Sequence, residues 1–420
     1  MRVAIPKDKL REGRNAALRK VKRERLRNKS LFTVSFLAIL CLVFLTSVRV
    51  SPTVAGLAAK IPGLAPVVHL INENKGVEDA FKNDYYEEIG AIATKDGITV
   101  TINGAIIDEY NALISYDFDY VSPTEELEDH NRYSIQLFQE NTEIIGTYYF
   151  GNLRDKNKTL SHSSHLLQLN IINGLPLDRT NFKLKIEFLN EEKTVIELPF
   201  TLKNPIAKTK TIEPNKLIEI DGQRFTIKSI KRTPLRLLID VELDPNNTMQ
   251  IIHFENVSIT LPNGEKRKTI NNGVPSNGSL RDGTLTMYLQ SNYFYDAEEL
   301  TLTIEAIHAV PKDDESIIVD FATQQILHKP SYIDWPMWME NNKLYVNTPV
   351  ETDYRTHPFY KGYKEDGSVL DPINYELHTS DDEGYNDVIY YPEYDGIVTI
   401  PIHYMYNPLS EGVEVKFNLK

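Results

Sequence analysis

The hydrophobic pattern of the chain changes along its length. Residues 31–48 form an uninterrupted apolar run without a charged side chain, LFTVSFLAILCLVFLTSV. From Lys95 onward apolar and polar residues alternate, as at Ile98, Val100 and Ile102. A period of two is typical of strands with one buried face. The pattern therefore predicts one apolar helix followed by a long, mainly β region.

The apolar run is long enough to cross a membrane as a helix. At ~1.5 Å per residue it reaches about 27 Å, close to the ~30 Å hydrocarbon thickness of a bilayer. A buried core helix and a cleaved secretory signal peptide are the alternatives, the latter because small residues follow at 54–59. The absence of a polar stripe and the long basic start favour an uncleaved transmembrane helix over residues 31–50.

The distribution of charge gives this helix a direction. Residues 1–30 contain twelve Lys or Arg and three acidic residues, a net charge of +9. The whole chain carries −13, so residues 31–420 carry −13 − 9 = −22. Cations next to a span keep their side in the cytoplasm. We therefore predict a single-pass protein of the cell membrane, with a cytoplasmic N-terminus and extracytoplasmic C-terminal domains.

The basic segment 1–30 has a candidate partner-binding face. If residues 8–28 are helical, Leu10, Leu18 and Val21 lie near one side. Such a face can dock into a groove of a cytoplasmic protein. Two alternatives remain open: the cations rest on anionic lipid, or the segment is a solvated topology signal without a partner.

The segment after the span, residues 51–94, is predicted to be a juxtamembrane region that is helical in part. Val77, Ala80, Phe81 and Tyr85 recur at helical spacing. We expect this stretch to pack beneath the first outer domain.

A turn motif and the strand pattern around it occur twice. Asp96-Gly97 corresponds to Asp221-Gly222, an offset of 221 − 96 = 125 residues. At this offset the apolar positions pair as Val100 with Phe225, Ile102 with Ile227, Ile114 with Ile239, Tyr116 with Val241 and Phe118 with Leu243. Farther on, Phe182, Leu184 and Ile186 match Leu300, Leu302 and Ile304 at an offset of 300 − 182 = 118. We predict tandem antiparallel β-sandwich, immunoglobulin-like domains over residues 95–205 and 206–329, with chance matching as the alternative.

Residues 330–420 are predicted to form a third, aromatic-rich β domain or an extension packed on the second. The segment contains both tryptophans, Trp335 and Trp338, and many tyrosines, and its last strand alternates from Val413 to Leu419. Exposed rings stack on sugars or anchor protein partners, so both tryptophans are candidates for binding a cell-wall or envelope ligand. The alternative is that these rings fill the core of the domain.

The sequence contains no catalytic or cofactor-binding motif. A G-x-S-x-G elbow, an H-E-x-x-H helix and a P-loop are all absent from it. His162 and His165 form an H-x-x-H pair without a third ligand at a recognisable spacing, and we interpret them as part of a polar loop. One cysteine, Cys41, excludes an intrachain disulfide. We predict that the protein is not an enzyme, has no metal or cofactor, and does not bind nucleic acid directly.

Several segments resemble a family of uncharacterised membrane-anchored proteins of Gram-positive, Bacillus-type spore-forming bacteria. They are the basic start and span, SVRVSPT (47–53), KIPGL (60–64), DYYEEIG (84–90) and KDGITVTI (95–102). Family members pair a domain of unknown function after the span with a second β-rich domain of unknown function. Some are described as anti-sigma factors of extracytoplasmic-function sigma factors.

The resemblance implies a regulatory protein. Residues 5–27 would hold a sigma factor at the membrane, and the outer domains would sense an envelope signal. The inner segment departs from the zinc-type anti-sigma pattern, because it is short and has no His or Cys ligands. We therefore predict a single-pass membrane regulator similar to an anti-sigma factor. The alternative is an extracytoplasmic binding or adhesion module.

Overall fold

The computed structural model describes residues 70, 74–121, 133–152, 161–189, 193–270, 275–348, 357–380, 384–409 and 412–419. The chain divides into two compact units, Met1–Glu73 and Asn74–Lys420. The predicted span and the candidate residues Leu10, Leu18 and Val21 lie outside the described residues. Among the residues that are described, no helix is both long and apolar enough to cross a membrane.

The second unit begins with a short helix, α4 (Lys75–Lys82). The side chain of Asn74 caps it by accepting hydrogen bonds from the backbone N–H groups of Gly76 and Val77. The predicted helical spacing extends to Tyr85, but the helix ends earlier and Asp84 takes a left-handed backbone conformation with φ of 59°. The chain turns there into the first strand.

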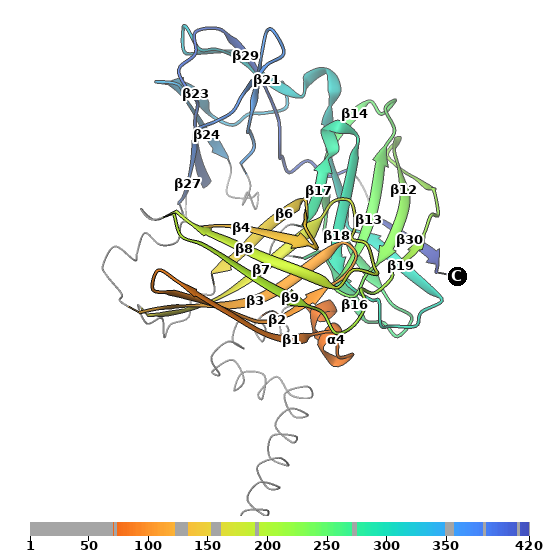
Figure 1. Cartoon of the computed structure of the whole chain (residues 1–420). Coiled ribbons are helices and arrows are strands. Elements are labelled where there is room, and N and C mark those ends of the chain that lie inside the picture. The colour runs from red at the N-terminus through yellow and green to blue at the C-terminus, as the bar shows by residue number, and fades with distance from the viewer. Residues whose placement is uncertain are drawn as a thin grey trace, which may run out of the picture. The chain divides into compact units, whose positions relative to one another are not determined.

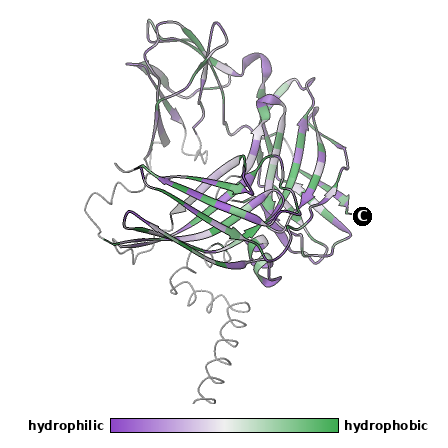
Figure 2. Ribbon diagram, in the orientation of Figure 1, coloured by the Kyte–Doolittle hydropathy of each residue, from purple (hydrophilic) through white to green (hydrophobic). Residues whose placement is uncertain are grey.

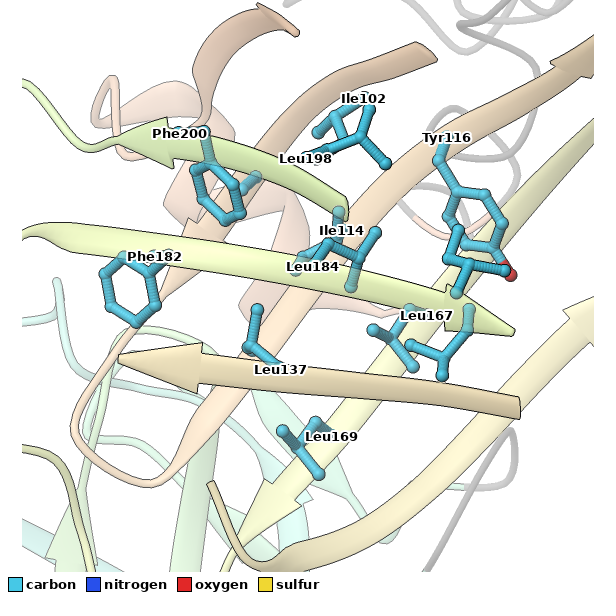
Figure 3. Close-up of a cluster of buried hydrophobic side chains, with 14 of the residues drawn as sticks. Ile102, Ile114, Tyr116, Leu137, Leu167, Leu169, Phe182, Leu184, Leu198 and Phe200 are labelled. Carbon is cyan, nitrogen blue, oxygen red and sulfur yellow. The ribbon is translucent and has the colours of Figure 1, made fainter. Parts of the chain in front are cut away.

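The first β-domain consists of two antiparallel sheets around one core (Figure 1). One sheet has the order β1 (Glu87–Lys95), β2 (Ile98–Ile107), β3 (Asn111–Tyr120), β7 (His162–Ile171) and β6 (Gly146–Asn152). The other has the order β5 (Thr142–Glu143), β4 (Tyr133–Gln139), β8 (Asn181–Phe188) and β9 (Val195–Thr201). Figure 3 shows Ile114 and Leu167 of the first sheet and Leu137 and Leu184 of the second in this core, all fully buried.

The second β-domain repeats this arrangement. One sheet has the order β10 (Lys210–Ile212), β12 (Gln223–Arg232), β13 (Arg236–Leu243), β18 (Thr284–Gln290) and β17 (Ser276–Ser279), and β11 (Lys216–Ile220) also pairs with β12. The other has the order β16 (Lys266–Lys268), β15 (Ser258–Thr260), β19 (Glu299–Ile304) and β30 (Val413–Asn418). A separate pair, β14 (Met249–Glu255) and β20 (Ala306–Pro311), and a short 3-10 helix, η2 (Leu280–Asp282), complete it.

The two domains share more than strand order. Both Asp-Gly turns are left-handed, with φ of 50° and 75° at Asp96-Gly97 and 49° and 75° at Asp221-Gly222. Each following hairpin is interrupted by a register shift, between Ile102 and Gly104 and between Ile227 and Ser229, again 125 residues apart. The offset read from the sequence therefore recurs in the backbone. The prediction of a mainly antiparallel β fold is confirmed.

The third β-domain is inserted between β20 and β30. One sheet has the order β22 (Gln325–His328), β21 (Ser316–Asp320), β29 (Ile397–Pro401), β25 (Gly362–Lys364) and β26 (Val369–Leu370). The other has the order β23 (Met337–Glu340), β24 (Lys343–Thr348), β28 (Gly384–Tyr390) and β27 (Asn374–Ser380). A 3-10 helix, η3 (Lys312–Asp314), precedes β21.

This division differs from the predicted segment 330–420. Ile317 and Val319 of β21 belong to the third core, although they precede residue 330. Val415 and Phe417 of β30 are buried in the second core instead, because β30 pairs with β19. Figure 2 shows that hydrophobic and hydrophilic residues alternate along the strands.

Candidate functional site

A cavity of about 520 Å³ lies between the second and third β-domains. The second domain contributes residues of β14, β17 and η2, and the third contributes residues of β25 and the segment after β29. Cavities of ~300–1,000 Å³ hold small ligands, and such sites often lie between domains. We take this cavity as the candidate ligand site.

Arg281 joins the two sides of the cavity. Its Nη2 donates a hydrogen bond of 2.5 Å to the carbonyl oxygen of Ile402, and its Nη1 lies 3.2 Å from Oε2 of Glu315. The backbone of η2 is capped by Ser279, whose hydroxyl accepts from the N–H of Arg281. The η2 helix ends at Gly283, where φ is 81°, a conformation that favours glycine. The guanidinium is therefore held by both domains.

Both histidines that line the cavity, His253 and His403, have a lowered pKa. Burial, together with the nearby His308, lowers the pKa of His253 to about 4, and Glu255 opposes this shift. Burial also lowers the pKa of His403, and the charges of Arg281, His357 and Lys361 act in the same direction. The charged lining residues are Arg281, Lys361 and Asp282, and with Glu315, the ion-pair partner of Arg281, the charges at the cavity sum to zero.

Tyrosine rings form the other part of the lining. Tyr360 stacks on Tyr375 with ring centroids 5.2 Å apart and an interplanar angle of 9°. Tyr404 lies edge-on to His253 at 5.3 Å. The carbonyl oxygen of Tyr360 accepts a 2.6 Å hydrogen bond from the hydroxyl of Tyr391. These contacts hold the rings in place.

A histidine–aspartate pair lies behind Tyr375 in the third domain. His357 Nδ1 is 2.6 Å from Oδ1 of Asp387, whose side chain is buried. Burial raises the pKa of Asp387, and His357 opposes that shift. Within the described ranges, no cluster of three or more His, Cys, Asp or Glu side chains could hold a metal ion. We interpret the pair as support for the aromatic rings.

Helix α4 docks on the second β-domain by direct backbone contact. A Cβ atom added at Gly76 would lie 2.5 Å from the backbone nitrogen of Ser291 and 3.0 Å from the oxygen of Leu235. Asp79 Oδ2 accepts a 2.7 Å hydrogen bond from Nη2 of the buried Arg267. The chain after α4 then enters β1 of the first domain. The helix is therefore fixed to one domain and covalently continuous with the other.

The tight turns between β2 and β3 and between β12 and β13 meet where the first two domains join. Asp108 is fully buried there and accepts hydrogen bonds from the N–H of Tyr110 (2.9 Å), Nδ2 of Asn111 (2.9 Å) and the N–H of Leu235 (3.0 Å). Nδ2 of Asn111 also donates to the hydroxyl of Thr233 at 3.1 Å. Asp108 and Thr233 are equivalent at the offset of 125, so the contact is formed by the same turn of both repeats.

Arg236 crosses the same junction from the second domain. Its Nη1 donates to Oδ1 of Asn170, its Nη2 donates to Oε1 of Gln168 at 3.4 Å, and its guanidinium lies 5.3 Å from the ring centroid of Tyr288. Burial lowers the pKa of Arg236 to about 10, and the charge of Asp108 opposes this shift. Burial also raises the pKa of Asp108. Two buried ionisable groups, an acidic and a basic one, therefore belong to this interface.

The two candidate tryptophans have different environments. Trp335 is 5% exposed and belongs to the third core, as expected if the ring fills it. Trp338 is 43% exposed on β23, an edge strand, and stacks on Tyr345 with centroids 4.9 Å apart and an interplanar angle of 1°. The structure does not bring either ring into the cavity lining. Only Trp338 offers an accessible ring face.

The H-x-x-H pair lies on β7, so its interpretation as a polar loop is wrong. His162 Nδ1 is 2.7 Å from Oδ1 of Asp119, whereas His165 is 5% exposed and stacks on Tyr116. Residues three apart on a strand point to opposite faces. The two imidazoles therefore cannot share a metal ion.

The cavity residues were not identified from the sequence. Arg281 and Lys361 are 361 − 281 = 80 residues apart and come from different domains. The one feature of the sequence that pointed to the cavity was the high number of tyrosines after residue 330. Three of them, Tyr360, Tyr363 and Tyr404, line the cavity.

Comparisons with known proteins identify two regions of the chain. The family model of a domain of unknown function, DUF4179, matches residues 25–119, and the model of a family of unknown function, DUF5643, matches residues 209–328. A search of curated proteins finds no match. A crystal structure described as that of the conserved domain protein from Bacillus anthracis is similar with a TM-score of 0.40 and 11% identity, covering 80% of this chain and 92% of that chain. The predicted pairing of two domains of unknown function is confirmed.

Proposed function

We propose that the chain is a single-pass membrane regulatory protein that acts by binding, similar to an anti-sigma factor. In this proposal residues 1–30 bind an extracytoplasmic-function sigma factor in the cytoplasm and residues 31–48 span the membrane. The β-domains, tandem immunoglobulin-like sandwiches followed by the inserted domain, lie outside and sense an envelope ligand. The sigma factor is carried over from the family resemblance, which covers roughly residues 1–330.

The docking of α4 is the observation that supports this proposal. The helix follows the predicted span in the chain and has only eight residues, and helices this short depend on packing for their stability. Its contacts with Ser291, Leu235 and Arg267 lie beside the junction of the first two β-domains. A ligand that shifts these domains would therefore change the segment leading to the membrane.

Capture of a sigma factor tests the inner end of the proposal. We expect the tagged full chain, in detergent, to retain a purified extracytoplasmic-function sigma factor at least about tenfold more than a control chain with residues 1–30 scrambled at equal charge. A triple variant with serine at Leu10, Leu18 and Val21 should lose this excess, because the apolar face is removed and the charge is unchanged. Equal retention by the scrambled chain would contradict the regulatory proposal.

A second candidate function is an extracytoplasmic binding module for cell-wall or envelope material. The exposed Trp338 ring stacked on Tyr345 favours it, because a fixed aromatic face can stack on a sugar ring. Trp335 is unsuited to the test, since its replacement would damage the third core.

Sedimentation with purified cell wall tests this second function. We expect Trp338→Ala to weaken binding to the cell wall by about two- to tenfold and so to reduce the fraction of full chain that sediments, because stacking of an aromatic ring contributes ~0.5–1.5 kcal/mol. Tyr149→Ala is the matched control, since that ring is 40% exposed on the first domain and away from the pair. Unchanged sedimentation of the Trp338 variant would remove support for an adhesion module.

A further inference from the structure

We propose that the return segment, residues 402–409, is an acid-sensitive latch between the second and third β-domains, with His253 of β14 as the group that takes up the proton. The segment leads from β29 of the third β-domain back toward β30, which belongs to the second. The inference goes beyond the proposed function, because it requires neither a sigma factor nor a cell-wall ligand. It rests on how the segment is held against β14 and β20.

A short stretch of backbone pairing attaches the return segment to β20. The carbonyl oxygen of Asn407 accepts from the N–H of Ala309 at 3.3 Å, and the N–H of Leu409 donates to the carbonyl oxygen of Ile307 at 2.8 Å. Nδ2 of Asn407 also donates to the carbonyl oxygen of Ala309 at 2.7 Å. Pairing this short is marginally stable by itself, so the side chains at the contact decide whether it persists.

His308 of β20 links the segment to β14. Its Nδ1 accepts a 3.0 Å hydrogen bond from the N–H of Asn407, so the proton of the ring is on Nε2. Nε2 then donates to Oε2 of Glu255 at 2.8 Å. The side chain of His308 is fully buried. The hydrogen bond to Asn407 therefore requires a neutral imidazole, and both ring nitrogens are used.

His253 lies between this link and an aromatic residue of the return segment. It is opposite His308 in the pairing of β14 with β20, and the two ring centroids are 5.7 Å apart. Tyr404 lies edge-on to His253 at 5.3 Å and 6.3 Å from the ring of His308. A proton on His253 would therefore place a positive charge beside the His308 link and under the segment.

The surroundings of His253 disfavour such a charge. Burial is the largest cause that lowers its pKa to about 4, His308 adds to the shift, and Glu255 opposes it. In water the pKa of an imidazole is ~6.5. Other titratable or charged groups that line the cavity with His253 come from η2, from the chain around β25 and from the return segment: Arg281, Asp282, Tyr360, Lys361, Tyr363, His403 and Tyr404. Asp282 is the one carboxylate among these lining residues.

Acid is therefore expected to favour the detached segment. Detachment exposes His253 to water, where its pKa returns toward 6.5, so attachment is strongest above pH 6.5 and weakens as the pH falls from about 6.5 to about 4. A group with these two pKa values changes the equilibrium at pH 5 by (1 + 10^1.5)/(1 + 10^−1), which is about thirtyfold.

Hydrogen exchange measured by mass spectrometry on the full chain in detergent tests the latch. The quantity compared is the protection factor of peptides that cover residues 402–409, which corrects for the pH dependence of the intrinsic exchange rate. We expect this factor to fall about thirtyfold between pH 7.5 and pH 5.0, while peptides from β13 keep theirs. The N–H groups of Asn407 and Leu409 are the reporters, because both donate in the contacts described above.

Two replacements of His253 separate the latch from general acid unfolding. His253→Phe keeps a ring beside Tyr404, His253→Gln keeps a polar side chain, and neither residue titrates, so we expect the fall to shrink to about threefold or less in both. His378→Phe makes the same change at an exposed position of β27 and should leave the thirtyfold fall intact.

Three results would overturn the proposal. A fall as large in both His253 variants as in the unchanged chain would exclude His253 as the group that takes up the proton. An equal loss of protection in the β13 peptides would show that the second β-domain unfolds as a whole. Constant protection of residues 402–409 between the two pH values would show that the segment does not respond to acid.

Discussion

Replacement of Asp108 by alanine is expected to lower the free energy of unfolding of the first two β-domains by about 3–5 kcal/mol. The buried carboxylate accepts hydrogen bonds from Tyr110, Asn111 and Leu235. Alanine would leave these donors without an acceptor and would remove the carboxyl group that opposes the lowering of the Arg236 pKa. Both losses occur where water cannot replace the missing partner.

The tryptophans allow the affected domains to be distinguished. Both belong to the third β-domain, so urea unfolding followed by fluorescence reports on that domain, whereas far-ultraviolet circular dichroism reports on all strands. We expect the dichroism transition of the unit Asn74–Lys420 to shift and the fluorescence transition to remain in place. Asp178→Ala, at an exposed position of the first domain, is the control. A shift below about 1 kcal/mol would show that the junction contributes little.

Gly76→Ala is expected to destabilise the docking of α4 by about 1–3 kcal/mol. In a free helix the same change stabilises by up to ~1 kcal/mol, because alanine has the higher helix propensity. At Gly76 the added Cβ would lie 2.5 Å from the backbone nitrogen of Ser291, so the helix must move away. The sign of the effect therefore reports whether α4 is docked.

Limited proteolysis of the segment around α4 measures this effect. We expect cleavage within residues 74–86 of the Gly76 variant to be about tenfold faster, since ~1.4 kcal/mol of lost docking raises the open population tenfold. Glu78→Ala is the control in the same helix, because its ion pair with Lys82 is on the surface and contributes only ~0.3–0.5 kcal/mol. Slower cleavage of the Gly76 variant would show that the helix is not packed as described.

The sequence predicted individual strands and tight turns, because both depend on residues that are close together in the chain. Alternation identified strands such as β2 and β8, and the repeated Asp-Gly turn located two hairpins in the same register. Left-handed turns of this kind favour Asn, Asp and Gly for steric reasons, so the residues themselves carry the information. The pairing of β19 with β30 is different: it joins residues more than a hundred positions apart, and the alternation in β30 fits any sheet with a free edge.

The cavity could not be predicted from the sequence, because it also depends on contacts between distant residues. A cavity between domains is defined by which loops meet, and Arg281 and Lys361 have no pattern in the sequence that links them. His165 was wrongly predicted to lie in a loop, because the residues around it in the sequence are polar. In the structure the rings of Tyr116 and Phe118 bury it. Tertiary contact, absent from a local window, decided both cases.

The insertion of the third β-domain imposes an order on biosynthesis. The second β-domain begins with β10, but its sheet remains open at the edge of β19 until residues 312–412 have been made and β30 follows. The third domain has all of its strands before that point, so it can fold while the second is still incomplete. During synthesis the exposed edge of β19 would be free to pair with other chains, so the incomplete second β-domain is the part of the chain most exposed to aggregation while it folds.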